Sequence, residues 1–260
     1  MLEWLKKYFN KETPHEQVEE VKPILITIHG FGTRRSKEMD VLKEWSKNHL
    51  PEVKAFDMFD PFDELDSDWH KWLKKAEDVM KEAQIEKREI YLLGYSMGGV
   101  LASYLASKYP VKKLILVAPA FLHFNIENYA SLVIKGANHL LNSGKNEDEK
   151  KPSMSTAFYT SFLDCVKHLK GAIVDVSCPV LIIQGDNDAV ISTRSSEWAF
   201  NQIKHEQKRC LFIHGGTHRL LSDFRVNNEA FLLIKLFIDD EILPFNLPDN
   251  ESLLNEHMDD

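Results

Sequence analysis

The amino-acid sequence predicts an α/β fold in which helices cover both faces of a mainly parallel central sheet. Short apolar runs alternate along the chain with segments whose apolar residues recur every three or four positions. This alternation is typical of strands that are separated by amphipathic helices. Several strand-like runs are apolar throughout, as in parallel sheets that are buried on both faces. In such sheets, functional groups lie in loops at the carboxyl ends of the strands.

The strand-like runs are β-branched or apolar and end near turn residues. The first, 24–28, stops at His29-Gly30, and the second, 53–58, is weaker. The other four are predicted over 89–93, 114–118, 180–184 and 209–213. A helix is predicted between the first two strands, over 37–48. Apolar residues that recur every three or four positions, among them Trp69, Trp72 and Ala76, form a broad stripe that indicates a second helix. We expect this stripe to pack into the core. Further helices are predicted over 100–109 and 228–239.

One long segment interrupts the alternation of strands and helices. Between 121 and 179 the chain holds helix-like stretches at 126–141 and 156–169 around a polar piece, without a clear strand. Because about sixty residues exceed an ordinary crossover, we expect a small helical cap inserted into the sheet domain. The expected organisation is a core of 1–120 and 180–241, a helical cap of 121–179, and an acidic C-terminal tail of 242–260. Residues 1–10 are expected to form a surface helix, with adsorption to a membrane surface as the alternative.

Composition narrows the class of protein. The 260 residues, 43% hydrophobic and 28% charged, fit an enzyme with one main domain. A net charge of −8 without a basic stripe excludes nucleic acid as the expected partner. No apolar stretch is long enough for stable membrane insertion, and three widely spaced cysteines indicate reduced thiols in the cytoplasm. His214 and His218 lie four apart, but the chain has no pair of closely spaced cysteines, and the acidic run from 57 to 68 lacks calcium-loop spacing, so we expect no metal and no cofactor.

The strongest functional signal is the sequence Gly94-Tyr95-Ser96-Met97-Gly98-Gly99. It lies between a predicted strand and a predicted helix, the setting in which a G-x-S-x-G turn exposes a serine hydroxyl on a strained bend. A glycine-rich turn with a capping serine is the alternative. Ser96 is therefore the candidate nucleophile for acyl transfer.

A serine nucleophile needs a base and an acid that orients the base. Two later strands end in suitable loops: Asp188 follows the strand at 180–184, and His218 follows the strand at 209–213. Asp186 is an alternative acid, although an Asx turn or a helix cap also explains it. His214 is an alternative base, although its place at a strand end favours a packed or hydrogen-bonded histidine.

Four motifs in this order resemble the α/β-hydrolase superfamily, and within it the small microbial carboxylesterases and monoacylglycerol lipases with a short cap. They are His29-Gly30-Phe31-Gly32, the pattern around Ser96, Gly185-x-x-Asp188-x-Val190, and Gly215-x-x-His218. The resemblance runs from about Pro23 to Asp239 and implies a Ser96, His218 and Asp188 triad. It also implies an oxyanion hole formed by the backbone N–H groups of Phe31 and Met97.

The resemblance implies a serine esterase that forms an acyl-enzyme with a small-molecule ester, such as a medium-chain acyl ester or a monoacylglycerol. A thioesterase or a peptidase would use the same residues, and a non-catalytic binding protein is a further alternative. Dehalogenases and epoxide hydrolases are disfavoured, since those relatives carry aspartate where this chain has Ser96. Whether the protein is a monomer or a homodimer stays open.

Two departures from the commonest pattern of this superfamily stand out. Tyr95 occupies a position where many relatives carry histidine; this position packs near the serine turn, so a change there bears on pocket shape and not on chemistry. Arg34 and Arg35 follow the expected oxyanion loop directly. They are either surface side chains or a fork of donors for a substrate carboxylate or phosphate.

Overall fold

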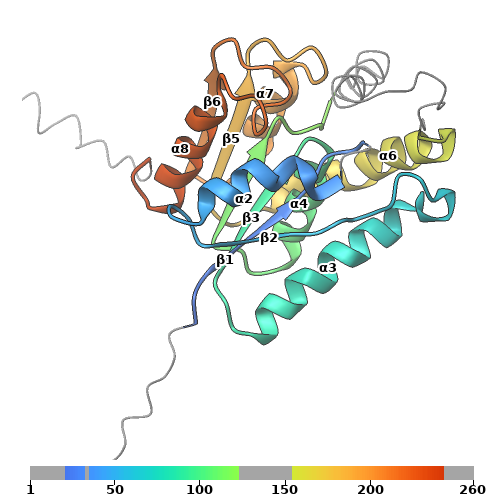
Figure 1. The fold of residues 1–260 in the computed structure, drawn as a ribbon, viewed down its shortest axis with the longest axis horizontal. Coiled ribbons are helices and arrows are strands. Elements are labelled where there is room, and N and C mark those ends of the chain that lie inside the picture. Colours follow the sequence, from blue (N-terminus) through green and yellow to red (C-terminus); the bar gives the residue numbers. More distant parts are fainter. Residues whose placement is uncertain (1–20, 33–34, 123–153, 243–260) are drawn as a thin grey trace, which may run out of the picture.

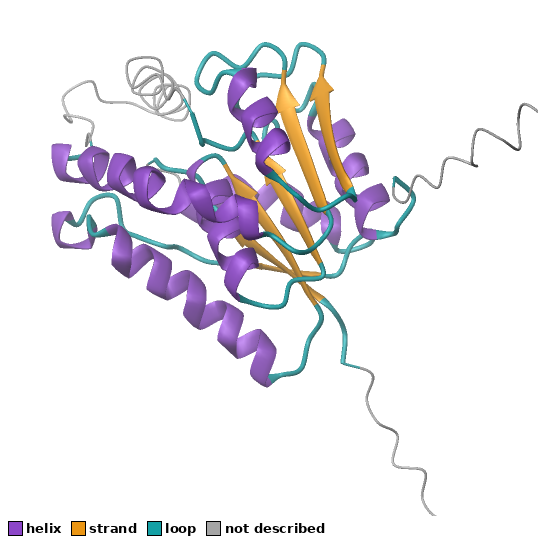
Figure 2. Ribbon diagram, turned by 180° about the vertical axis from the view of Figure 1, so that it is seen from behind, coloured by secondary structure: helices purple, strands orange, loops and turns teal. Residues whose placement is uncertain are grey.

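A computed structural model of the protein describes residues 21–32, 35–122 and 154–242 (Figure 1). Its centre is a six-stranded, entirely parallel sheet with the strand order β2-β1-β3-β4-β5-β6. The strands are β1 (Ile24–Ile28), β2 (Glu52–Ala55), β3 (Ile90–Tyr95), β4 (Lys113–Val117), β5 (Val180–Gly185) and β6 (Lys208–Ile213). The predicted fold class is confirmed, because the sheet is parallel and helices lie on both of its sides (Figures 1 and 2).

The helices divide between two apolar layers that the sheet separates. One layer joins alternate strand residues to α3 (Trp69–Ile85), α4 (Met97–Lys108), α6 (Thr156–Leu169) and α7 (Thr193–Gln202). The other joins the remaining strand residues to α2 (Asp40–Ser46) and α8 (Asn227–Ile238). Short 3₁₀ helices complete the described chain at Arg35–Met39, Glu64–Asp66 and Lys170–Asp175.

The strand order determines where a site can form. After β1 the chain moves outward to β2, then crosses back to β3 on the other side of β1. At such a reversal the two following loops diverge to opposite faces and leave a crevice at the carboxyl ends of the strands. The loop that holds Phe31 follows β1, and Ser96 follows β3. Both therefore lie at this crevice.

Two predicted elements differ clearly from the structure, and one helix was not predicted. Strand β2 ends at Ala55, short of the predicted Met58, because the Met58 amide leaves the ladder and donates to His29 Nε2 at 3.0 Å. The helix predicted over 37–48 divides into a 3₁₀ turn and α2. Helix α7 was not predicted, since its buried residues include the small Ser195, Ser196 and Ala199 and give a weak apolar stripe.

The predicted cap is described only in part. Helix α6 has the predicted bounds, and it packs against α3 and α4, where the Trp69 amide donates to Ser161 Oγ at 2.9 Å. The remaining cap residues, 123–153, lie outside the described residues, as do the predicted N-terminal helix at 1–10 and all of the predicted tail except 242. The division into core, cap and tail therefore stays a prediction.

Candidate active site

Ser96 sits on a strained turn between β3 and α4. Its φ of 55° lies in the left-handed region that is costly for a residue with a Cβ. The end of β4 and the loop after it hold this conformation, since the Ser96 amide donates to the Val117 carbonyl at 2.9 Å and the Ala120 amide donates to the Ser96 carbonyl at 3.1 Å. The turn directs the hydroxyl toward the loop after β6, where it meets an imidazole.

The two glycines of the motif permit close backbone approach around the serine. A Cβ on Gly98 would stand 2.1 Å from the carbonyl oxygen of Ile28 at the end of β1. A Cβ on Gly94 would stand 2.4 Å from the carbonyl oxygen of Gly98. Only glycine lets the first turn of α4 rest on both strands. The motif thus brings Ser96 next to the loop that follows β1.

His218 lies beside Ser96, although 122 residues separate them in the chain. Its Nε2 is 3.1 Å from Ser96 Oγ, and the histidine is only 5% exposed. The hydroxyl of Tyr95 donates to the main-chain carbonyl of His218 at 2.8 Å. Tyr95, the residue before the serine, therefore holds the loop that carries the His218 imidazole in place. Sequence reasoning missed this contact.

Asp188 completes the chain of contacts. Its Oδ2 lies 2.8 Å from His218 Nδ1, and its Oδ1 accepts hydrogen bonds from the amides of Val190 and Ile191 at 2.8 and 2.9 Å. Burial raises the pKa of the Asp188 carboxyl, but the charge and hydrogen bond of His218, with the two amides, outweigh burial and bring the pKa below its ordinary value. The carboxylate is thus ionised at neutral pH.

The lowered pKa of Asp188 predicts a specific dependence of stability on pH. A carboxyl whose pKa is lower in the folded state contributes stability above its unfolded pKa of about 3.9, and this contribution disappears as the pH falls through the folded pKa. The free energy of unfolding should therefore differ most between the natural protein and Asp188→Asn at neutral pH. Urea titrations between about pH 6 and pH 3 should show this difference shrinking. A difference independent of pH would contradict it.

The alternative acid and base form a separate pair at the surface. His214 Nδ1 lies 2.8 Å from Asp186 Oδ2, and the side chain of His214 is fully exposed. The predicted hydrogen-bonded state of His214 is found, whereas the packed alternative is wrong. Asp186 also accepts from the Gly215 amide at 2.7 Å, which fits its expected role in a turn. Within the described chain, Ser96 Oγ is hydrogen-bonded to His218 and not to Asp186 or His214.

The loop after β1 is held by two side chains that the sequence did not single out as functional. His29 is fully buried; its Nδ1 lies 2.7 Å from the Gly30 carbonyl, and its Nε2 accepts from Met58 N–H. A carboxylate oxygen of Glu38 accepts from the Gly30 amide at 3.1 Å. These contacts orient the backbone that leads into Phe31, whose ring is buried and stacks on Phe162 at 4.9 Å between centroids.

Met97 is the first residue of α4 and follows Ser96 directly. The first amides of a helix have no acceptor within the helix, so its N–H is available at the serine turn. Arg34 lies outside the described residues, and the side chain of Arg35 is likewise not described. The choice between a surface and a substrate role for these two arginines stays open.

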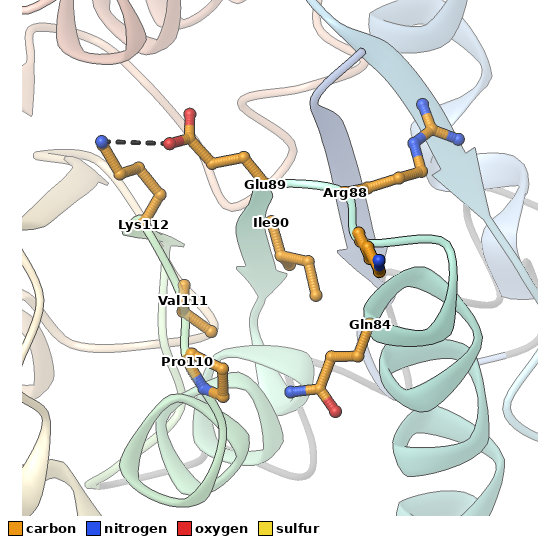
Figure 3. A pocket seen from close by; sticks show the side chains of 8 residues that line it. Gln84, Arg88, Glu89, Ile90, Pro110, Val111 and Lys112 are labelled. Carbon is orange, nitrogen blue, oxygen red and sulfur yellow. Dashed lines mark ion pairs between the residues drawn. The ribbon is translucent and has the colours of Figure 1, made fainter. Parts of the chain in front are cut away.

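Other groups in the described chain are poorer candidates for chemistry. A cavity of about 530 Å³ lies at the amino end of β3, opposite Ser96, and is lined by Gln84, Lys87, Arg88, Glu89, Ile90, Pro110, Val111 and Lys112. Figure 3 shows that Lys112 there pairs with Glu89, at 3.0 Å. All three cysteines are free, and burial raises the pKa of Cys165 and of Cys178 to about 12, unsuited to a thiolate nucleophile.

Within residues 21–32, 35–122 and 154–242, no group of three or more His, Cys, Asp or Glu side chains is arranged to hold a metal ion. The helices in the same ranges are all too short or too polar to cross a bilayer.

Comparison with known proteins supports this reading of the fold. The chain is 22% identical over 216 residues to a carboxylesterase of Bacillus subtilis, covering 76% of this chain and 85% of that protein. It is 32% identical over 117 residues to human monoacylglycerol lipase ABHD6, covering 41% of this chain and 33% of that protein.

Solved structures share the fold at low sequence identity. One is a soluble variant of monoglyceride lipase from Saccharomyces cerevisiae, with a TM-score of 0.64, 17% identity, and coverage of 86% of this chain and 88% of that one. Another is a metagenome-derived lipolytic enzyme, with a TM-score of 0.62, 18% identity, and coverage of 82% and 92%. With the parallel sheet, these similarities confirm the predicted α/β-hydrolase fold.

A family match identifies the class. The family described as "Serine aminopeptidase, S33" matches residues 57–156 and 143–225, which together span more than half of the 260 residues. The predicted resemblance to carboxylesterases and monoacylglycerol lipases, and the predicted class of enzyme, are confirmed by this match and the relatives above. The chain therefore belongs to the serine aminopeptidase, S33 family of α/β-hydrolases, an esterase- and lipase-type family.

Proposed function

We propose that this hydrolase cleaves carboxylic esters with Ser96 as nucleophile, His218 as general base and then acid, and Asp188 as the group that orients His218. The observation that carries the proposal is the unbroken line of contacts from Ser96 Oγ to His218 Nε2 and from His218 Nδ1 to Asp188 Oδ2, at 3.1 and 2.8 Å. These three side chains come from separate loops, and each is largely or fully buried.

The neighbours of His218 determine which tautomer its neutral ring adopts. An ionised carboxylate only accepts hydrogen bonds, so the Nδ1 that faces Asp188 carries the proton. Nε2 of the neutral ring then presents a lone pair to the Ser96 hydroxyl. This arrangement supports general-base activation of a serine that is otherwise a poor nucleophile.

The reaction would proceed in two halves. Ser96 Oγ attacks the ester carbonyl carbon while its proton moves to His218 Nε2, and the amides of Phe31 and Met97 stabilise the oxyanion. The tetrahedral intermediate expels the alcohol, which takes the proton from His218, and leaves an acyl-enzyme. Water then attacks the acyl carbon with His218 again accepting a proton, and His218 returns this proton to Ser96 Oγ as the carboxylic acid is released. One oxyanion donor contributes about 3 kcal/mol to lowering the barrier. No metal or cofactor takes part in these steps.

The proposed substrates are short- to medium-chain acyl esters or monoacylglycerols. The names of two relatives, a carboxylesterase and a monoacylglycerol lipase, support this class. Thioesters and peptides would pass through the same intermediates, so a substrate panel decides between these classes.

A fluorophosphonate probe tests the proposal directly. The probe should attach to one serine, and peptide mass spectrometry should locate the adduct on Ser96, because only a hydroxyl paired with a base reacts quickly. Protein labelled to completion should lose hydrolysis of p-nitrophenyl esters in proportion to the labelled fraction. Stable activity after full labelling, or an adduct on another serine, would contradict the assignment. Acyl esters of increasing chain length, thioesters and aminoacyl amides then rank the substrate classes.

A further inference from the structure

Gln184 is a fully buried amide side chain on an otherwise apolar face of strand β5. Val180 and Ile182, four and two residues earlier, belong to the apolar layer on this side of the sheet. Burying an amide in such a place is costly unless its polar atoms are hydrogen-bonded. The contacts of Gln184 therefore indicate what the side chain does.

The neighbours of Gln184 determine which way its amide points. Nε2 lies 2.8 Å from Asp188 Oδ2 and within 3.4 and 3.5 Å of the carbonyl oxygens of Gly185 and Ile191. These three oxygens only accept hydrogen bonds, so the group that faces them must be the NH₂. On the other side, Oε1 accepts from the hydroxyl of Ser196 at 2.8 Å, and Ser196 is itself fully buried in α7.

We propose that Gln184 is a positioning residue for Asp188, and that Ser196 of α7 keeps the Gln184 amide in the donating orientation. This inference rests on the proposed function, in which Asp188 orients His218. It adds a line of buried contacts that runs from α7 through β5 to the candidate acid.

Asp188 accepts four hydrogen bonds, and the position of each donor shows what Gln184 contributes. Oδ1 accepts from Val190 and Ile191, which belong to the same loop as Asp188, while Oδ2 accepts from His218 and Gln184. Gln184 is therefore the donor that ties Oδ2 to the rigid sheet. Without it, the remaining donor to Oδ2 among the described residues would be the imidazole that Asp188 has to orient. A neutral donor can hold a carboxylate without adding a charge that would compete with the imidazolium.

Gln184→Met tests this role, because methionine has a similar length and volume but no amide. We expect kcat for ester hydrolysis to fall about 10-fold or more, since hydrogen bonds to charged acceptors are the stronger class. KM should stay within about twofold, because Gln184 touches the acid and not the substrate. Gln202→Met, the same change at the last residue of α7, is the matched control and should leave kcat unchanged. Circular dichroism and thermal melting check the fold of both variants.

Gln184→Glu supplies a readout that a purely structural role would not move. A protonated glutamic acid can donate to Asp188 and accept from Ser196, as glutamine does. Ionisation removes the donor and places two carboxylates side by side, which disfavours the charged form and raises the pKa of the pair. Activity relative to the natural protein should therefore be nearest to normal at the acid end of the pH profile and fall as the pH rises. The relative activity of Gln184→Met should not vary with pH in this way.

Ser196→Ala extends the test if Gln184→Met fails to fold. It removes the hydroxyl that fixes the amide, so kcat should fall less than in Gln184→Met, and the two changes together should cost no more than Gln184→Met alone. The proposal is overturned if a folded Gln184→Met keeps kcat within twofold, or if Gln184→Glu parallels the natural pH profile. Ser96→Ala measured alongside separates the two ideas, since an active Ser96→Ala would refute the proposed function itself.

Discussion

Replacement of Ser96 by alanine is expected to lower kcat/KM for ester hydrolysis by at least about 10³-fold. The Ser96 hydroxyl lies 3.1 Å from His218 Nε2, the nitrogen proposed to take its proton. Its loss removes the nucleophile, and in serine hydrolases such a loss leaves only the residual rate that comes from binding and the oxyanion donors. The change should be measured with a p-nitrophenyl ester in single-substrate kinetics.

The fold of Ser96→Ala should remain that of the natural protein. Alanine keeps the same Cβ at the strained φ of 55°, and the backbone bonds to Val117 and Ala120 do not involve the hydroxyl. Ser103→Ala is a matched control, because Ser103 is also buried in this region and its hydroxyl only bonds the Gly99 carbonyl within α4. This control should keep full activity. Turnover by purified Ser96→Ala close to that of Ser103→Ala would rule out Ser96 as nucleophile.

Much of the arrangement around Ser96 could be predicted because a parallel sheet places all the carboxyl ends of its strands at one edge. Once the strands before Ser96, Asp188 and His218 are identified by their apolar runs, their following loops must share that edge. The structure brings these three side chains into contact. The order of the residues along the chain and the pattern of strands were sufficient to place these side chains at one edge of the sheet. They were not sufficient to predict the distances between the side chains.

The supporting contacts could not be predicted, because they join residues with no pattern of their own. The bond from the Tyr95 hydroxyl to the His218 carbonyl spans 123 residues and depends on the main-chain path of a loop. The bond from Ser196 to Gln184 depends on α7, whose buried positions include serine and alanine and do not look apolar. A glutamine at the end of a buried strand suggests that its amide has a hydrogen-bond partner. The sequence does not indicate which residue that partner is.

Burial distinguishes two acid–histidine pairs between which sequence reasoning left a choice. Asp186 and His214 lie in the same two loops as Asp188 and His218, and by spacing alone either pair fits a strand end. The structure separates them by exposure: the first pair lies in solvent, whereas the side chains of the second are at most 6% exposed. Within these loops the two acids lie only two residues apart, and the two histidines four. Whether each side chain is buried depends on the conformation of the loop, which the sequence indicates only loosely.

Gly98→Ala is expected to have the largest effect on stability and, after Ser96→Ala, the largest effect on activity. The new Cβ would stand 2.1 and 2.6 Å from the carbonyl oxygens of Ile28 and His29, distances that no pair of such atoms adopts. These oxygens belong to the backbone at the end of β1, so the clash cannot be relieved by turning a side chain. Either the first turn of α4 or the end of β1 must move. We expect the free energy of unfolding to fall by roughly 2 kcal/mol or more, as in other overpacked cores.

The same displacement acts on the reaction, because the two proposed oxyanion amides lie on opposite sides of this contact. Met97 precedes Gly98 on α4, and Phe31 follows the end of β1, so separating the two elements separates the two donors. A misplacement of about 1 Å can cost 10²-fold in rate, and kcat should fall at least that far in protein that is still folded by circular dichroism. Gly171→Ala is the matched control, since a Cβ there meets no atom within 4 Å. If both alanine variants kept natural stability and turnover, the contact between α4 and β1 would not be what aligns the oxyanion donors.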